Sequence, residues 1–518
     1  MNFLRAAASV ALFLLWLAGP AGAEDVTLTS RDGSIELTGD LLGYDGEYYR
    51  IATEYGVLTV DGSGVICDGP GCPSLGSYVA QLTFSGAPEV SSVLIPALIE
   101  GFALRRGYAV GRADGADGGL VYTLYEGEAG GQKAAEFTIL RNSSDEGFAD
   151  LLGENADFAL TLREVTGNEA RLARDAGLGD LKSVRQTRVL ALDALVPVVA
   201  PGNPVRKLTI ENLVAIYSGK VTNWSELGGE DAPITAYLAE DDVGFTGLFL
   251  AKLMRGQGVA QSVLRKPSNH AVTHAVVNDP FGIGIATFSD PGGAEIVTLT
   301  GSCGFEVAPG VEAIKAEDYP LTAPLYLYLP ARRLPKIGRE FLTYLRSSAA
   351  QMVVRRTGLV DQMPGETTVD DQGRRLANAI AVAGDEVTLE QLKALAELMV
   401  GDTRLSVTFR FRDGSSALDG QSLSNVALLA NLLEAGRFDG RVVRFVGFTD
   451  GNGRASVNLR LAEKRARAVR QAVLDAAEAL DPARVEMQVA AFGEALPMAC
   501  DDTGWGRQVN RRVEVWLH

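Results

Sequence analysis

Residues 24–76 alternate polar and apolar positions along the chain. Runs such as Ser34–Leu37, Tyr48–Ile51 and Val57–Val60 repeat with a period of two, which is typical of strands that bury one face. Asp-Gly pairs, which favour tight turns, separate these runs. The pattern predicts a small antiparallel β module.

Between residues 77 and 360 the pattern changes, because strand-like runs now alternate with stretches of helical spacing. Phe137–Leu140 and Leu195–Ala200 are strand-like. The expected helices include Val93–Leu104, Ile210–Tyr217 and Ile337–Ser347. Strands that alternate with helices over such a length predict an α/β domain.

A polar, breaker-rich stretch begins at Asp361 and favours a linker. Thr388 precedes leucines at helical spacing and predicts an N-cap, so residues 361–402 are expected to hold a linker and a helix. Residues 403–518 predict a compact α+β unit of βαβαββ order. Its expected strands are Leu405–Phe411, Arg441–Phe448, Val485–Phe492 and Arg512–Leu517, and its expected helices are Ser424–Glu434 and Arg454–Leu480.

The first 23 residues have the pattern of a secretory signal peptide. Arg5 supplies the positive start, Ala6–Leu17 is an apolar run, and Ala21-Gly22-Ala23 offers small residues before Glu24. A membrane anchor is the alternative, but the run is shorter than the ~20 residues that a spanning helix needs. We therefore expect an exported chain that starts near Glu24 and has no transmembrane segment after cleavage.

Charge and composition narrow the function classes. The chain has 48 Lys and Arg against 65 Asp and Glu, a net charge of −17. Nucleic-acid binding needs a basic face, so we expect no nucleic-acid partner. A hydrophobic content of 47% excludes a disordered chain.

Four cysteines are present, and an exported chain lies where disulfides persist. Cys67 and Cys72 flank a Gly-Pro-Gly turn that can bring the two thiols together, so we predict a local disulfide. Cys303 and Cys500 fall in different predicted domains, and their pairing stays open. His270 and His274 have an i,i+4 spacing, but two ligands do not make a metal site. We expect no metal and no cofactor.

Three ordered motifs mark the C-terminal unit. They are Val446–Gly453 (VGFTDGNG), Asn458 with Leu461–Ala466, and Asn510–Glu514. On these residues the unit resembles the OmpA-like C-terminal domain, which binds peptidoglycan. The family usually has His before the Thr-Asp pair, where this chain has Phe448. The resemblance implies a peptidoglycan site formed by Thr449, Asp450, Asn458, Arg465 and Arg511.

The chemistry of the wall peptide fits these residue types. Peptidoglycan stem peptides carry diaminopimelate in many bacteria, and its side-chain end has one ammonium and one carboxylate. Asp450 can accept hydrogen bonds from the ammonium, while Arg465 can form a bidentate pair with the carboxylate. The alternative is an ordinary surface Asp–Arg ion pair without a ligand, which contributes ~0–1 kcal/mol to stability.

A second resemblance covers residues 77–360. Its markers are Leu192–Ala200, Asn203–Val205, Leu208–Leu213, Ile216–Trp224, Leu227–Gly229 and Phe281–Gly284. On these residues the chain resembles the periplasmic phosphate-binding protein family, the receptors of phosphate importers of the ABC transport type. The resemblance implies two α/β lobes with a ligand cleft between them, and chain crossings near residues 190 and 285.

The loops of that cleft depart from the family pattern. The family tends to have Gly-Ser-x-Thr in the first loop, where this chain offers Gly86, Ala87 and Glu89. In the second loop Val243 and Phe245 flank Gly244 and replace two hydroxyls, although Thr246 is adjacent. Arg163 belongs to a third, partly kept segment. Each lost charge-assisted hydrogen bond is worth ~1.5–3 kcal/mol, and Glu89 would repel an anion, so phosphate is disfavoured as the ligand.

Together these features predict a non-enzymatic periplasmic binding protein. Its C-terminal domain would hold peptidoglycan, and its receptor-like domain would take a small anion or another solute. The alternative is a structural protein of the cell envelope whose receptor-like domain binds a protein partner or no solute. We expect the protein to lie in the periplasm in association with the cell wall. A position at the inner face of the outer membrane is one option within this expectation.

Overall fold

The computed structural model describes residues 25–518 except 75–77, 116–117, 242–243, 385, 413–414 and 416. The predicted signal peptide, 1–23, lies outside the described residues. The chain divides into two compact units. The smaller comprises the N-terminal part up to Ala80 with Arg333–Arg339, and the larger comprises Gln81–Arg332 with Glu340–His518. None of the described helices is both long and apolar enough to cross a bilayer.

The smaller unit is built on a five-stranded antiparallel sheet of order β4-β3-β2-β1-β5. Its strands are β1 (Asp25–Ser30), β2 (Glu36–Tyr44), β3 (Tyr48–Thr53), β4 (Gly56–Asp61) and β5 (Val65–Asp68). Val26, Leu28, Tyr49 and Ile51 form its buried core. Cys67 and Cys72 are disulfide-bonded, so the predicted β module and its local disulfide are confirmed.

The larger unit begins with an eleven-stranded sheet of order β14-β13-β15-β11-β19-β10-β6-β9-β8-β7, to which β16 adds beside β11. The strands are β6 (Ala80–Gly86), β7 (Tyr108–Asp114), β8 (Leu120–Glu126), β9 (Lys133–Arg141), β10 (Phe158–Thr161), β11 (Thr187–Val199), β13 (Thr235–Ala239), β14 (Leu264–Lys266), β15 (Gly282–Thr287), β16 (Glu295–Ile296) and β19 (Thr322–Tyr328). A small second sheet joins β12 (Lys207–Thr209), β17 (Thr298–Thr300) and β18 (Glu306–Val307).

Ten helices surround these strands within the described residues. They are α1 (Pro88–Ser91), α2 (Leu94–Arg106), α3 (Ser144–Leu152), α4 (Gly167–Asp175), α5 (Ile210–Tyr217), α6 (Gly244–Phe249), α7 (Asn269–Val277), α8 (Val311–Lys315), α9 (Lys336–Leu345) and α10 (Ser348–Arg356). Capping boxes at Ser143, Thr166 and Thr209 begin α3, α4 and α5, because each hydroxyl accepts from a free N–H of the first turn.

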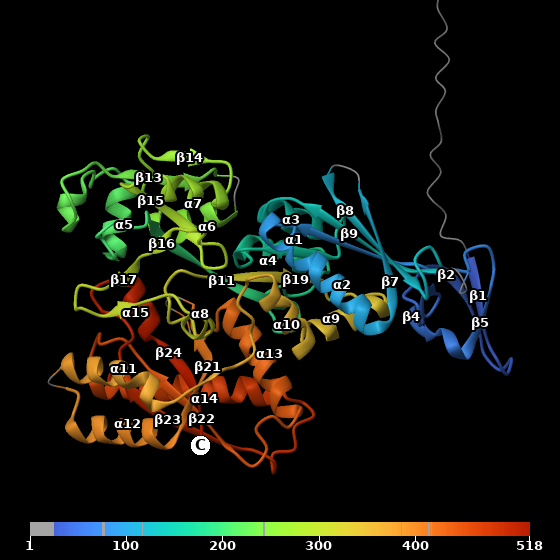
Figure 1. Ribbon diagram of the computed structural model, residues 1–518. Coiled ribbons are helices and arrows are strands. Elements are labelled where there is room, and N and C mark those ends of the chain that lie inside the picture. Colours follow the sequence, from blue (N-terminus) through green and yellow to red (C-terminus); the bar gives the residue numbers. More distant parts are fainter. Residues whose placement is uncertain are drawn as a thin grey trace, which may run out of the picture. The chain divides into compact units, whose positions relative to one another are not determined.

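Two strands carry the chain between the two lobes of this sheet (Figure 1). The first half of β11 pairs with β19, and its second half pairs with β15 and β16. Nearly every residue of β11 is buried. The crossing predicted near residue 190 is therefore present. The one predicted near 285 is wrong, because β15 pairs in parallel with β13 inside the second lobe, and β19 makes the return crossing.

The C-terminal sheet has the order β20-β21-β24-β22-β23, in which only β22 and β23 are parallel. Its strands are β20 (Glu366–Thr367), β21 (Thr403–Arg410), β22 (Val442–Phe448), β23 (Glu486–Gly493) and β24 (Arg512–Leu517). Its helices are α11 (Val369–Ala381), α12 (Leu389–Gly401), α13 (Gly420–Glu434), α14 (Ala455–Ala476) and α15 (Gly504–Asn510).

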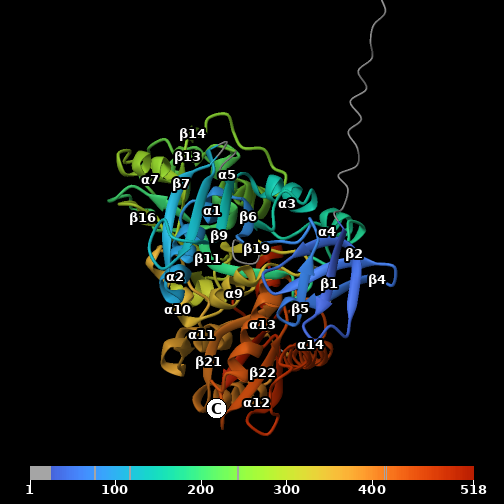
Figure 2. The ribbon, with the colours of Figure 1, turned by 90° about the vertical axis from the view of Figure 1, so that its right-hand side faces the viewer.

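Side chains along β22 point alternately to the two faces of this sheet, and a different pair of helices covers each face (Figure 1, Figure 2). Val443 and Phe445 pack with α13 and α14 in one buried cluster. Val446 and Phe448 point the other way and pack with α11 and α12. Residues 361–402 thus contain two helices and a strand, rather than the linker and single helix that we expected. Thr388 caps α12 as predicted.

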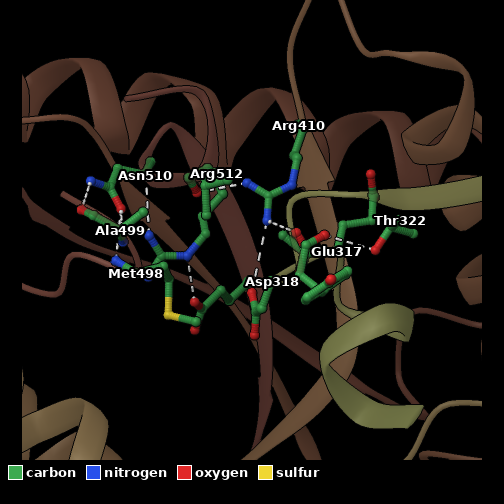
Figure 3. A network of polar contacts seen from close by, with 12 residues as sticks. Glu317, Asp318, Thr322, Arg410, Met498, Ala499, Asn510 and Arg512 are labelled. Atoms are coloured by element: carbon green, nitrogen blue, oxygen red, sulfur yellow. Dashed lines mark hydrogen bonds and ion pairs between the residues drawn. The ribbon is translucent and has the colours of Figure 1, made fainter. Parts of the chain in front are cut away.

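Within the larger unit, buried charges join the receptor-like part to the C-terminal sheet. Asp318 accepts two hydrogen bonds from Arg404 on β21, at 2.6 and 3.0 Å. Arg410 donates to the backbone oxygen of Glu317 (Figure 3). A disulfide links Cys303 to Cys500. The pairing that the sequence left open is therefore a covalent bond between these two parts.

Candidate functional site

The first candidate site lies where β22 ends. Thr449 and Asp450 follow Phe448 at the carboxyl end of this strand, and both are nearly buried. The backbone N–H of Thr449 donates to the Gly493 oxygen at 2.8 Å, which ties this turn to the end of β23. The Thr449 hydroxyl is buried and has no hydrogen-bond partner. The end of the strand therefore presents a fixed carboxylate beside an unused hydroxyl.

Two further predicted residues hold Asp450. Arg511 lies between α15 and β24, and its Nη1 is 2.9 Å from Asp450 Oδ2. Asn458, on the first turn of α14, donates from Nδ2 to the Asp450 backbone oxygen (3.3 Å) and to Glu494 Oε2 (2.6 Å). The structure thus brings Thr449, Asp450, Asn458 and Arg511 together from three elements.

Arg465 lies seven residues, or two helical turns, after Asn458 and so shares its face of α14. Its guanidinium carbon is 5.0 Å from the centre of the Phe411 ring, a cation–π contact. Nε and Nη1 are buried and have no hydrogen-bond partner. Burial and the nearby Arg511 cation lower the pKa of Arg465, whereas Asp450 opposes that shift. A guanidinium with unused donors is prepared for bidentate contact with a carboxylate.

Two residues of this site were not found from the sequence. Glu494 orients Asn458. Asp501 accepts from the Gly451 backbone N–H at 2.6 Å and from Asn510 Nδ2 at 2.7 Å. Asp501 is also the neighbour of Cys500 in the chain, so the disulfide to Cys303 fixes the loop that supports the site. In the sequence, the only sign that Asp501 supports the site was the adjacent Cys500, whose pairing was left open.

The second candidate site is the cleft loop that follows β6. Gly86 has φ +139°, and a Cβ there would lie 2.0 Å from the Leu160 oxygen, so only glycine fits. The Ala87 N–H donates to that same oxygen at 2.9 Å. Ala87 is 1% exposed. Its N–H is therefore used by the sheet and is not free for a ligand.

Glu89, on the short helix α1, reaches the start of α6 in the second lobe. A Cβ at Gly244 would lie 3.0 and 3.1 Å from the two carboxylate oxygens of Glu89. Burial raises the pKa of Glu89, and the backbone N–H groups of Gly244 and Phe245 partly offset this rise. Glu89 Oε2 is buried without a close hydrogen-bond partner. An acid of the protein therefore occupies the position in which helix N–H groups would meet an anion.

The remaining cleft residues divide between the two lobes. Phe245 and Thr246 are buried in α6, and the Thr246 hydroxyl has no partner. Arg163 is paired with Asp145 and Glu169, at 2.5 and 2.7 Å, and stacks 4.8 Å from the Phe148 ring. Two carboxylates of its own lobe therefore bind the Arg163 guanidinium. Arg163 is not available beside Glu89 to bind an anion.

Metal-ligating side chains do not gather in the part of the chain that the structure describes. No group of three or more His, Cys, Asp or Glu residues there is arranged to hold a metal ion. His270 lies 3.5 Å from Asp290, a single surface contact.

Comparisons with known proteins match the two parts of the larger unit separately. Residues 116–349 match the model of the PBP superfamily domain, and residues 410–511 match that of the OmpA family. "Phosphate-binding protein PstS" of Bacillus subtilis is 26% identical over 210 residues, which is 40% of this chain and 68% of that protein. "Probable lipoprotein YiaD" of Escherichia coli is 32% identical over 116 residues, 22% of this chain and 48% of that protein.

Among solved structures, an ABC-type phosphate transport receptor from Vibrio cholerae is 22% identical, with a TM-score of 0.43. The match covers 54% of this chain and 99% of that one. The predicted combination of α/β and α+β folds is confirmed by the family matches and by the observed sheets. The chain therefore carries a PBP superfamily domain followed by a C-terminal OmpA family domain.

Proposed function

We propose that this protein is a periplasmic binding protein held non-covalently to peptidoglycan by its C-terminal domain. The observation that carries the proposal is the arrangement around Asp450. A carboxylate at the end of β22 lies near the guanidinium of Arg465, two of whose nitrogens are buried and without a partner. Leaving such donors unsatisfied costs free energy, which a bound carboxylate would recover.

The wall peptide supplies the matching groups. The ammonium of diaminopimelate would pair with Asp450, and its carboxylate would bridge the free nitrogens of Arg465. The Thr449 hydroxyl, which is also without a partner, would complete the pocket. Arg511, 2.9 Å from Asp450, holds this carboxylate at the end of the strand. Asn458 and Glu494 keep the strand end in place.

For the receptor-like domain we propose a function other than phosphate capture. The PstS relatives are named as phosphate-binding proteins, but here Glu89 faces the N–H groups that would receive the anion. A carboxylate at that point repels a second anion. Because Glu89 spans the cleft, we favour two functions over that of a phosphate importer's receptor. The domain would either be a rigid interaction module or bind a solute of different charge.

The proposed domains follow the predicted boundaries: a signal peptide at 1–23, a β module at 24–76, a receptor-like domain at 77–360, a connecting segment at 361–402 and a wall-binding domain at 403–518. A non-enzymatic role suits the chain, since both candidate sites are built for binding. A place in the periplasm, at the cell wall, follows from the same proposal.

Co-sedimentation with purified peptidoglycan sacculi tests this function. We expect the wild-type chain to sediment with sacculi and Arg465→Ala and Asp450→Asn to remain in solution. Arg467→Ala is the matched control, because Arg467 lies on the same helix but is exposed and, among the described residues, pairs with Glu463 alone. Equal binding by all four proteins would overturn the site.

A further inference from the structure

One short segment of the C-terminal domain is anchored to the receptor-like part. It comprises Cys500–Asp502 and lies between β23 and α15. Cys500 is disulfide-bonded to Cys303, which belongs to the loop between β17 and β18. The Cys303 N–H also donates to Cys500 Sγ at 3.1 Å, and the Ser302 hydroxyl donates to the Asp502 carboxylate. The segment is therefore held by a loop outside its own domain.

Two glycines lie directly against Cys500. A Cβ at Gly301 would lie 2.2 Å from the Cys500 sulfur, and a Cβ at Gly506 would lie 1.9 Å from the Cys500 backbone oxygen. Both positions need glycine, because any larger residue would push Cys500 out of its place. Cys500 is thus packed by the receptor-like part on one side and by α15 on the other.

The same segment supports both sides of the proposed peptidoglycan site. Asp501 Oδ2 accepts from the Gly451 N–H at 2.6 Å, and Gly451 directly follows Asp450. Asp501 Oδ1 accepts from Asn510 Nδ2 at 2.7 Å, and Asn510 directly precedes Arg511. One carboxylate therefore fixes the chain beside each member of the Asp450–Arg511 ion pair.

Asn510 extends this support to the residues before Cys500 (Figure 3). It is fully buried, and its Oδ1 accepts from the N–H groups of Met498 and Ala499 at 2.7 and 3.1 Å. Its Nδ2 donates to the Ala499 oxygen at 2.8 Å. Residues 494–503, all of which the structure describes, form neither helix nor strand, so these hydrogen bonds and the disulfide determine their conformation.

We propose that the Cys303–Cys500 disulfide is a redox-sensitive latch on the peptidoglycan site, and that Asp501 is the positioning residue through which it acts. This inference rests on the proposed peptidoglycan binding. With the bond intact, the receptor-like part holds Asp501 against the turn that follows β22. With the bond broken, the segment regains conformational freedom. The turn then loses its fixed acceptor, and the affinity for peptidoglycan falls.

A dithiol is the class of reductant that would open the latch. Cys303 is exposed, as are its neighbours Ser302 and Gly304, whereas Cys500 is 6% exposed. A thiolate of the reductant attacks the Cys303 sulfur, the S–S bond breaks, and Cys500 leaves as a thiolate that takes up a proton. The second thiol of the reductant then displaces Cys303 as a free thiol. The protein gains two electrons and two protons, and the reductant becomes a disulfide.

Co-sedimentation of the mature chain with purified sacculi, with and without dithiothreitol, tests the latch. We expect the reduced wild type to bind at least tenfold more weakly than the oxidised form. Cys303→Ser/Cys500→Ser should bind as weakly as the reduced wild type under both conditions. Cys67→Ser/Cys72→Ser is the matched control, because it keeps the long-range bond, and it should respond to the dithiol as the wild type does. Circular dichroism of the same samples checks that they are folded.

Asp501→Asn separates positioning from stability, because it keeps both the disulfide and the size of the side chain. Only one end of an amide accepts hydrogen bonds, so it cannot accept from Gly451 and Asn510 together. We expect at least fivefold weaker sacculus binding without reductant, and less than a twofold further change with dithiothreitol. Asp475→Asn is the matched control, since Asp475 is exposed on α14 and contacts Gln471. This variant decides the proposal even if the reduced chain unfolds.

Two results would overturn the latch. Equal sedimentation of the oxidised and reduced wild type would show that the bond does not control the site. Sedimentation of Asp501→Asn at the wild-type level would show that Asp501 does not position it. Either result leaves the proposed peptidoglycan binding standing. If the oxidised wild type does not sediment with sacculi, the proposed function fails and the latch fails with it.

Discussion

Replacing the disulfide between Cys303 and Cys500 by serines should lower the stability of the larger unit by several kcal/mol. The two cysteines are 197 residues apart. The loop-closure relation for a cross-link of that span gives about 5 kcal/mol of lost stabilisation at 25 °C. The Cys67–Cys72 bond spans 5 residues, for which the same relation gives about 2 kcal/mol. The long-range bond should therefore matter more than the local one.

Urea unfolding of the mature chain measures the difference. The double variant Cys303→Ser/Cys500→Ser should unfold at clearly lower urea than the wild type. Tryptophan fluorescence monitors this, because Trp224, Trp505 and Trp516 all belong to the larger unit. The matched control is Cys67→Ser/Cys72→Ser, which should leave this signal almost unchanged because that bond belongs to the other unit. Equal urea midpoints for the wild type and the Cys303/Cys500 variant would refute the reasoning.

Three more predictions follow from buried charges. Asp318→Ala should lower the free energy of unfolding by about 3–5 kcal/mol, because it leaves Arg404 buried without its bidentate partner; a urea-derived loss below about 1 kcal/mol would contradict this. Burial raises the pKa of Glu514, but Arg375, Arg404 and Arg512 outweigh it and hold that pKa well below its usual range. The unfolded state therefore binds a proton at Glu514 below about pH 4.3, while the folded state does not. Because of this difference, the urea midpoint should fall as the pH drops from 5 towards 2. A urea midpoint that stays constant over this range would contradict the ion pairs of Glu514 with the three arginines. Glu89→Ala should gain calorimetrically measurable phosphate binding, since it frees the N–H groups at the start of α6, whereas micromolar binding by the wild type would show that Glu89 does not block the cleft.

Local patterns predicted most of the secondary structure. The period-two runs of the β module are strands, Ile210–Tyr217 is a helix with the predicted bounds, and Thr388 caps its helix. Short elements were missed where tertiary contacts decide the conformation. β20 has two residues and exists because it pairs with β21, and α15 contains two glycines, which disfavour a helix by themselves.

Long-range pairings limited what the sequence could predict about the sites. The motifs located Asp450, Arg465 and Arg511, but only the structure shows that Asp450 is paired with Arg511 while Arg465 keeps free donors. The Glu89 carboxylate was predicted to repel an anion, but only the structure shows that it lies against the start of a helix in the other lobe. Contacts between segments that are far apart in the chain leave no periodic signal, and the Cys303–Cys500 bond is the clearest case.

The central claim is that the Asp450–Arg465 site binds the cell wall. Its most direct test is the sedimentation of Arg465→Ala with purified sacculi, measured beside Arg467→Ala. Our account predicts that Arg465→Ala loses binding by at least tenfold while Arg467→Ala keeps it. Sedimentation of both variants at the wild-type level would contradict the account.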